Sequence, residues 1–134
     1  MSASSLSTAG VLLIAVVAVE YGGLSLLRFI AGRIPGYLDN PVRQDLFRAG
    51  HAHAGVLVIL ALVGMLYVDQ TGLSDTVREL VRWGLVAPPI LMPLGFFLSV
   101  ASPRAERPNA LISLVYLGAV VLAAGVLTLG INLL

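Results

Sequence analysis

Four long apolar segments, separated by short polar connections, organise the chain. They run roughly over residues 9–31, 50–68, 83–101 and 110–133. Each is close to the length of about 20 residues that an α-helix needs to cross the hydrocarbon core of a bilayer. Because the connections are short, consecutive helices have to run antiparallel. The pattern predicts an all-α integral membrane protein, an up-down bundle of four transmembrane helices forming one domain over residues 1–134.

The composition supports this prediction. Hydrophobic residues make up 58% of the chain and charged residues 11%, and the mean hydropathy is +0.97, whereas soluble domains carry about 25% charged residues. The net charge of +1 gives no reason to expect a nucleic acid as partner. The chain has no cysteine, which restricts any metal site to imidazole, carboxylate and carbonyl donors. The first apolar segment outlasts the apolar core of a signal peptide, about 7 to 15 residues, and we expect it to be retained.

The arginines indicate an orientation. All eight basic residues are arginine, and most flank the first and third connections. Because cytoplasmic loops of membrane proteins carry an excess of positive charge, this distribution favours both termini outside. We expect the protein to lie in a bacterial inner (cytoplasmic) membrane, with the lipid bilayer as its first partner.

Local signals mark where two of the helices begin. Asn40 followed by Pro41 is typical of an N-cap and a first helical residue, so the second helix should start before its apolar part does. Thr76 and Glu79 have the spacing of a capping box for the third helix. Gly72, Ser74 and Asp75 would then form the preceding turn.

Prolines interrupt the third helix. Pro88, Pro89 and Pro93 have no amide hydrogen to donate, so carbonyls one turn earlier lose their helical partners. We therefore predict a proline-kinked third helix. The kink could shape a cavity, or it could reflect only the frequency of proline in membrane helices. The fourth helix repeats small residues that allow close packing, namely Gly118, Ala119, Ala123 and Gly125.

Both histidines lie at the start of the second apolar segment. Residues two apart on a helix point about 200° apart, so His51 and His53 cannot both bind one metal ion from a continuous helix. Arg48, His51 and Gly55 share one helical stripe, which suits a haem. His51 would be the axial ligand, Gly55 would leave room for the macrocycle and Arg48 could pair with a propionate. A histidine near a helix end can equally be solvated or bonded to a carbonyl, and His53 could hydrogen-bond to a neighbouring helix.

Glu20 lies near the middle of the first apolar segment. An ionised carboxylate there is costly without a partner, so it should be protonated, paired with an arginine or bonded to a histidine. A functional role and a helix-to-helix hydrogen bond both remain open. Asn109 and Tyr116 are further candidates for lining a pocket. No phosphate-binding loop, serine nucleophile motif or pair of carboxylates supports a nucleotide-binding or hydrolase function.

Short motifs over residues 47–104 resemble the styrene oxide isomerase and hydroxylaminobenzene mutase group. They are a histidine after Arg48-Ala49 and the segment 95–98, Gly-Phe-Phe-Leu, followed by Ser102-Pro103. The resemblance implies a small membrane protein that binds haem b through a second-helix histidine, assembles as a trimer and uses ferric iron as a Lewis acid on an epoxide oxygen. By this resemblance His51 is the axial ligand, although the segment 52–55 around His53 is also similar to the motif.

Two residues depart from that family pattern. Leu57 stands where the family has an asparagine about two turns after the histidine, and Phe97 replaces a tyrosine. These are the polar groups that would orient an epoxide, so the resemblance supports the fold and the haem better than the reaction. Glu20, Phe97 and Asn109 are the candidate catalytic residues.

The leading hypothesis is therefore a haem-binding membrane protein, and an isomerase of a small hydrophobic substrate that enters from the lipid. The first alternative is a proton-coupled transporter centred on Glu20, because a carboxylate in the first of four short helices is similar to small multidrug-resistance exporters. The second is an accessory subunit of a larger membrane complex, in which the histidines are structural.

Overall fold

The computed structural model describes residues 1–134 and contains helices without strands. Four helices are long and apolar enough to cross a membrane, the third crossing being residues 75–99, which confirms the all-α prediction. The elements in chain order are α1 (Ala3–Ala31), α2 (Pro41–Val68), α3 (Asp75–Val86), α4 (Pro88–Ser99), a short 3₁₀-helix (Ala110–Ile112) and α5 (Ser113–Ile131).

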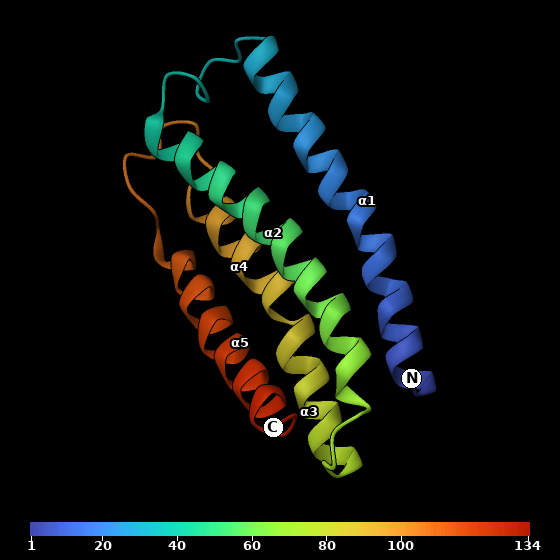
Figure 1. Ribbon diagram of the computed structural model, residues 1–134. Coiled ribbons are helices and arrows are strands. Elements are labelled where there is room, and N and C mark those ends of the chain that lie inside the picture. Colours follow the sequence, from blue (N-terminus) through green and yellow to red (C-terminus); the bar gives the residue numbers. More distant parts are fainter.

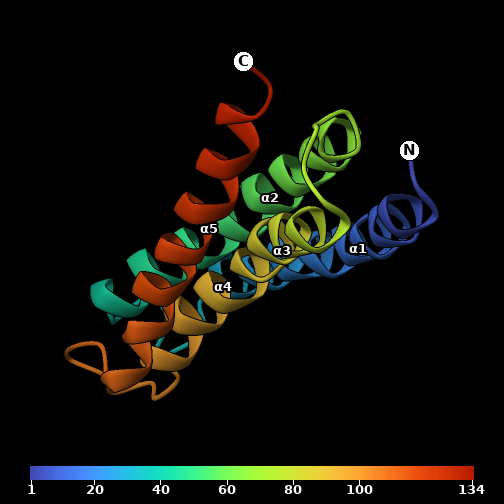
Figure 2. The ribbon, with the colours of Figure 1, turned by 90° about the horizontal axis from the view of Figure 1, so that it is seen from below.

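The helices run up and down, as predicted, and both termini lie at the same end of the molecule (Figure 1). Their packing is more open than a closed bundle. Helix α1 packs along α2, α2 packs also on α3 and α4, and α5 packs on α3 and α4 (Figure 2). Only Ser5 and Leu12 of α1 are buried. Helix α1 therefore lies at the periphery of the bundle and contacts the rest of the molecule mainly through α2.

The helix starts follow local capping chemistry. The Asn40 side chain accepts a hydrogen bond from the Arg43 amide at 3.1 Å, and Pro41 is the first helical residue, as predicted. The prediction of a capping box at Thr76 is wrong. Helix α3 begins two residues earlier, because Ser74 has extended backbone angles and its hydroxyl accepts from the Val77 amide at 3.5 Å. Asp75 then lies in the first turn, where a negative charge favours a helix N-terminus.

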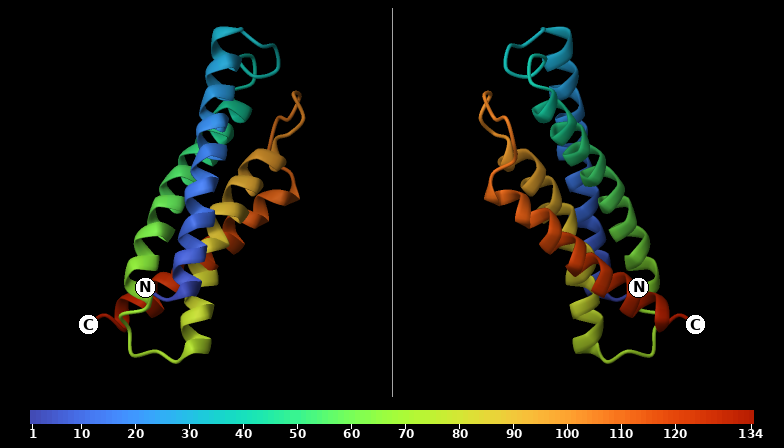
Figure 3. Two further views of the ribbon diagram at one scale, coloured as in Figure 1. Left: turned by 90° about the vertical axis from the view of Figure 1, so that its right-hand side faces the viewer. Right: turned by 90° about the vertical axis from the view of Figure 1, so that its left-hand side faces the viewer.

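The prolines divide the third crossing into two helices. Helix α3 ends at Val86 and α4 begins at Pro88, with Ala87 between them. Pro88 and Pro89 occupy the first turn of α4, where a missing amide hydrogen costs least, and Pro93 lies inside it. The axis changes direction between α3 and α4 (Figure 3), which confirms the predicted kink.

Glycines allow α5 to pack closely on the kinked helix. A Cβ atom added to Gly84 of α3 would lie 2.9 Å from the Gly125 Cα, and one added to Gly118 would lie 2.5 Å from Met92 Cγ. The predicted seam of small residues is thus formed by its two glycines. Ala119 and Ala123 are exposed.

Two clusters hold the helices together. The buried apolar core joins α1, α2, α3 and α5 toward the end that carries the termini; its members are Leu12, Val58, Ala61, Met65, Val68, Val81, Leu85 and Leu129. Toward the other end, aromatic rings form a chain. Phe29 contacts Tyr37, Tyr37 contacts Phe47, and Phe47 contacts Phe97, with ring centroids 5.3–6.0 Å apart. The candidate site lies between these two clusters.

Candidate functional site

His51 packs against bare backbone of α1. A Cβ atom added to Gly22 would lie 3.5 Å from His51 Nδ1, and one added to Gly23 would lie 3.1 Å from Nε2. The second distance is shorter than ordinary van der Waals contact, so any side chain at residue 23 would press on the imidazole. The half-buried His51 ring makes no hydrogen bond to any protein group. It is a polar side chain with both nitrogens free.

His53 faces the opposite way, as helical geometry predicts. Its ring lies 4.9 Å from the ring of Phe96 on α4. Its Nδ1 is 2.7 Å from the Ala49 carbonyl oxygen, one turn earlier on the same helix. The two histidines therefore cannot bind the same metal ion. His53 lines none of the cavities of the molecule.

The first cavity beside His51 is a groove of about 300 Å³ between α1 and α2, here named the outer groove. Its lining residues are Val16, Val19, Glu20, Gly23, His51, Gly55, Val58 and Ile59. Glu20 and His51 are the only polar side chains among them. Glu20 makes no ion pair with any arginine. The outer groove is thus lined by a carboxyl group and an imidazole, neither of which has a hydrogen-bond or ion-pair partner in the protein.

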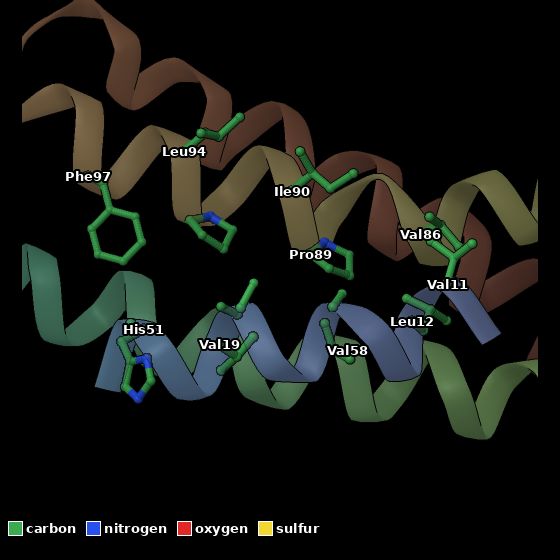
Figure 4. A pocket seen from close by; sticks show the side chains of 15 residues that line it. Val11, Leu12, Val19, His51, Val58, Val86, Pro89, Ile90, Leu94 and Phe97 are labelled. Atoms are coloured by element: carbon green, nitrogen blue, oxygen red, sulfur yellow. The ribbon is translucent and has the colours of Figure 1, made fainter. Parts of the chain in front are cut away.

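The second cavity lies on the other side of α1, between α1, α2 and the kinked third helix (Figure 4). This inner cavity has a volume of about 360 Å³. It is lined by Val11, Leu12, Ala15, Ala18, Val19 and Gly22 of α1, by His51, Ala54 and Val58 of α2, and by Val86, Pro89, Ile90, Pro93, Leu94 and Phe97 of α3 and α4. His51 is its only polar side chain. Because two of the prolines line it, the kink does shape a cavity.

His51 lines both the outer groove and the inner cavity. Gly22, which faces Nδ1, lines the inner cavity, and Gly23, which faces Nε2, lines the outer groove. The imidazole therefore stands between a groove that contains a carboxyl group and a cavity that is otherwise apolar.

Arg48 and Gly55 lie near His51 on α2. Arg48 is exposed one turn before His51, and its Nη2 donates to Gln44 Oε1 at 3.4 Å. Gly55 lines the outer groove one turn after His51, and a Cβ atom added there would lie 3.7 Å from Val19. Of the stripe expected from the sequence, His51 and Gly55 therefore line the outer groove, and Arg48 lies outside it.

The remaining candidate residues lie in different parts of the fold. Phe97 lines the inner cavity near His51. Leu57 is buried and lines neither cavity. Asn109 lies before α5 and caps the 3₁₀-helix, because its side-chain oxygen accepts from the Leu111 amide at 2.8 Å. Tyr116 is 69% exposed on α5. The structure thus brings Glu20 and Phe97 to His51 and leaves the other three apart.

A polar cluster at the termini has no counterpart in the sequence analysis. Arg82 is buried, and its guanidinium contacts Asp69 at 2.6 Å, Glu79 at 2.9 Å and the Ser5 hydroxyl at 3.0 Å. Burial on its own raises the pKa of Asp69, but hydrogen bonds from the Ser2 amide, the Ser5 and Ser2 hydroxyls and Arg82 lower it from 3.8 to about 2. These residues are far apart in the sequence, so no local pattern could reveal the cluster. It ties the start of α1 to α2 and α3.

The donor set beside His51 fits a cofactor that brings most of its own ligands. The chain has no group of three or more His, Cys, Asp or Glu side chains placed to hold a bare metal ion. A haem needs only one or two axial ligands from the protein, since its macrocycle supplies four nitrogens. No second His and no Met or Tyr side chain lines the outer groove or the inner cavity. Within one chain, a haem on His51 would keep one open coordination position.

Comparison of the chain with protein-family models, with curated proteins and with solved structures finds no match.

Proposed function

We propose that this protein binds haem b in the membrane through Nε2 of His51, on the side of the outer groove. The observation that carries the proposal is the free imidazole of His51, which lies between two cavities and against two glycines of α1. Polar side chains within membrane-spanning helices are expensive and usually serve a function. His53 offers less room, because its ring packs on Phe96.

The surroundings of His51 favour a planar anionic cofactor. Gly23 and Gly55 place no side chain in the outer groove, which leaves backbone surface for a flat ring. Arg48 is exposed one turn nearer the polar start of α2, so its guanidinium can pair with a propionate. The groove is open on its outer side, and a second copy of the chain in the homo-oligomer expected from the family resemblance, a trimer, could cover it.

A bound ferric haem supplies a Lewis acid, which suits isomerisation of a small hydrophobic, epoxide-like substrate arriving from the lipid. The chain itself contributes apolar walls that keep water out, and Glu20 is the only side chain in the groove that can give or take a proton at its carboxyl group. Neither Leu57 nor Phe97 lines the outer groove, so the orientation of a substrate there depends on the shape of the groove.

The test is haem content and epoxide turnover of purified protein from haem-replete cells. We expect about one haem per chain, lost in His51→Ala and kept in His53→Ala, together with conversion of an aromatic epoxide to a carbonyl product. Equal haem retention in the two variants, or loss in His53→Ala alone, would contradict the assignment. Haem binding without turnover would keep the cofactor and remove the isomerase.

One observation favours a second function, proton-coupled transport centred on Glu20. Its carboxyl group has no ion pair and faces a groove in the middle of α1, as a carrier site requires. Such a protein would release protons when a hydrophobic cation binds, and Glu20→Gln would abolish this release. A protein that binds no haem but shows this proton release is a transporter. An accessory subunit would show neither.

A further inference from the structure

The charges of the molecule are divided unequally between its two ends. The end formed by the first connection (residues 32–40) and the third (residues 100–109) carries six arginines, namely Arg28, Arg33, Arg43, Arg48, Arg104 and Arg107. Three carboxylates lie there, those of Asp39, Asp45 and Glu106, so this end has a net charge of +3. The end with the termini has two arginines, Arg78 and Arg82, against three carboxylates, Asp69, Asp75 and Glu79, a net charge of −1. The excess of positive charge is therefore confined to one side of the membrane.

The two connections at the positive end form one continuous surface. They lie at the same end of the molecule (Figures 1 and 3). The Asn40 amide nitrogen donates to the carbonyl oxygens of Pro103 at 3.2 Å and Ala105 at 2.8 Å. Arg43 Nε donates to the Val100 carbonyl oxygen at 3.1 Å. The Arg43 guanidinium is thus used to hold the connections together.

Four other arginines at this end have no partner in the protein. The side chains of Arg28, Arg33, Arg104 and Arg107, here named the arginine surface, are exposed and make no hydrogen bond and no ion pair. All three ion pairs of the molecule lie at the opposite end. Arg33 has a φ of 48°, in the left-handed region that favours glycine. Local backbone preference therefore does not explain an arginine at this residue.

The arginine surface lies at the level where helices leave the membrane. Arg28 is in the last turn of α1, which ends at Ala31, and Arg107 comes three residues before the 3₁₀-helix that begins at Ala110. Long basic side chains near the ends of membrane-spanning helices extend toward the headgroup region. Phosphate is the group that a guanidinium meets at this level, and it binds phosphate through two parallel hydrogen bonds.

We propose that the arginine surface binds the headgroups of anionic phospholipids, of the phosphatidylglycerol class. Clusters of four or more basic residues beside a membrane-spanning helix attract anionic lipid, and each residue contributes about a fivefold preference at the surface. A zwitterionic headgroup has the same phosphate but also an ammonium group, which the net positive charge of this end repels. The proposal goes beyond the proposed function and is independent of haem, because Arg48, assigned to a propionate, is not part of the arginine surface.

The experiment measures lipid selectivity by electron paramagnetic resonance, with full-length protein in phosphatidylcholine bilayers that contain a trace of spin-labelled phospholipid. Lipids in contact with the protein move slowly, and their fraction gives the association constant of the labelled lipid. We expect phosphatidylglycerol to associate about twofold more strongly than phosphatidylcholine, because only the lipids at one end of the protein meet the arginine surface. Equal association constants would overturn the proposal.

Matched variants separate the arginine surface from the net charge of the protein. Arg104→Gln and Arg78→Gln each remove one positive charge, at opposite ends, and Arg78 is already paired with Asp75 at 3.3 Å. Arg104→Gln should lower the preference for phosphatidylglycerol, and Arg78→Gln should leave it unchanged. The triple variant Arg33→Gln, Arg104→Gln, Arg107→Gln should reduce the ratio of association constants to about one. A preference that persists in the triple variant, or an equal loss in the two single variants, would contradict binding at this surface.

Ionic strength tests the wild-type protein without any substitution. Raising sodium chloride from about 0.1 M to 1 M shortens the screening length from about 10 Å to 3 Å, so the preference for phosphatidylglycerol should disappear. Sodium phosphate at equal ionic strength should act no more strongly than the chloride. A stronger effect of phosphate would assign the four guanidinium groups to a soluble phosphate compound, and an unchanged preference at high salt would exclude an electrostatic origin. Either result would overturn the proposal.

Discussion

The cluster at the termini and the pair in the outer groove show two different uses of polar groups in an apolar chain. Arg82 is buried, and its guanidinium is bonded to Asp69, Glu79 and Ser5. Glu20 and His51 line the same groove and have no hydrogen-bond partner in the protein. A buried charge that is fully paired contributes to the fold, whereas a polar pair left free is available to a ligand. The first region therefore stabilises the fold, and the second is the proposed site of function.

The largest expected effect is loss of stability when Arg82 is replaced. Arg82→Met leaves the carboxylate of Asp69, which is 13% exposed, without its ion-pair partner. Removing one member of a buried ion pair costs about 3–5 kcal/mol, so the midpoint of denaturant-induced unfolding in detergent should fall sharply while haem binding is unchanged in the protein that remains folded.

The control for this variant is Arg78→Met. Arg78 pairs with Asp75, which is 97% exposed, at 3.3 Å. An exposed pair contributes about 0–1 kcal/mol. If the two variants lose similar stability, the cluster at the termini is not structural and the comparison fails.

Acid should weaken the same cluster by a smaller amount. The pKa of Asp69 is lowered from 3.8 to about 2 in the folded protein. A lowered pKa stabilises the fold fully above the unfolded value, and this contribution is lost as the pH falls from about 4 toward 2. The loss should be about 2 kcal/mol, measured as the free energy of unfolding against pH. Asp69→Asn should remove this pH dependence; an unchanged profile in that variant would assign it to another group.

A methyl group at residue 23 tests the role of Glu20 and His51 without changing the charge of either residue. Gly23→Ala places a Cβ atom 3.1 Å from His51 Nε2 and must displace the imidazole. We expect haem affinity to fall about tenfold, since a shift of this kind costs on the order of 1–2 kcal/mol. Gly10→Ala is the matched control, because a Cβ atom there has no neighbour within 4 Å. Equal haem affinities of the two variants would place the haem away from this nitrogen.

The smallest expected effect concerns Tyr37, whose buried hydroxyl is unpaired although it lies beside no cavity. Removing an unpaired polar group while keeping the ring should leave stability unchanged or raise it by about 1 kcal/mol. Thermal unfolding of Tyr37→Phe measures this. A loss of stability would show that the hydroxyl has a partner, such as a buried water.

Local patterns in the sequence predicted most of the fold. The apolar segments predicted four crossings, Asn40-Pro41 predicted the start of α2, and the prolines predicted the kink at Ala87. The start of α3 was placed two residues late, because Ser74 competes with Thr76 for the cap and only the backbone angles decide between them. The open packing of α1 was not predicted, because the sequence of an apolar helix does not show which of its faces contact other helices.

The candidate site was predicted in part. Helical spacing indicated that His51 and His53 face different helices, and the cost of a carboxylate in the membrane singled out Glu20. Nothing in the sequence showed that Gly22 and Gly23 face His51, because that contact joins residues about 28 positions apart on two helices. Nor did the sequence show that Arg82 is buried, because Ser2 and Asp69 approach Arg82 from distant parts of the chain.

The most direct test of the account is the electron paramagnetic resonance spectrum of the ferric, haem-loaded protein, recorded for the wild type, His51→Ala and His53→Ala. One imidazole and one open position predict a high-spin ferric signal that persists in His53→Ala and is absent in His51→Ala. A low-spin signal from two axial histidines, or a high-spin signal that depends on His53, would contradict the assignment of the free imidazole to the function of this protein.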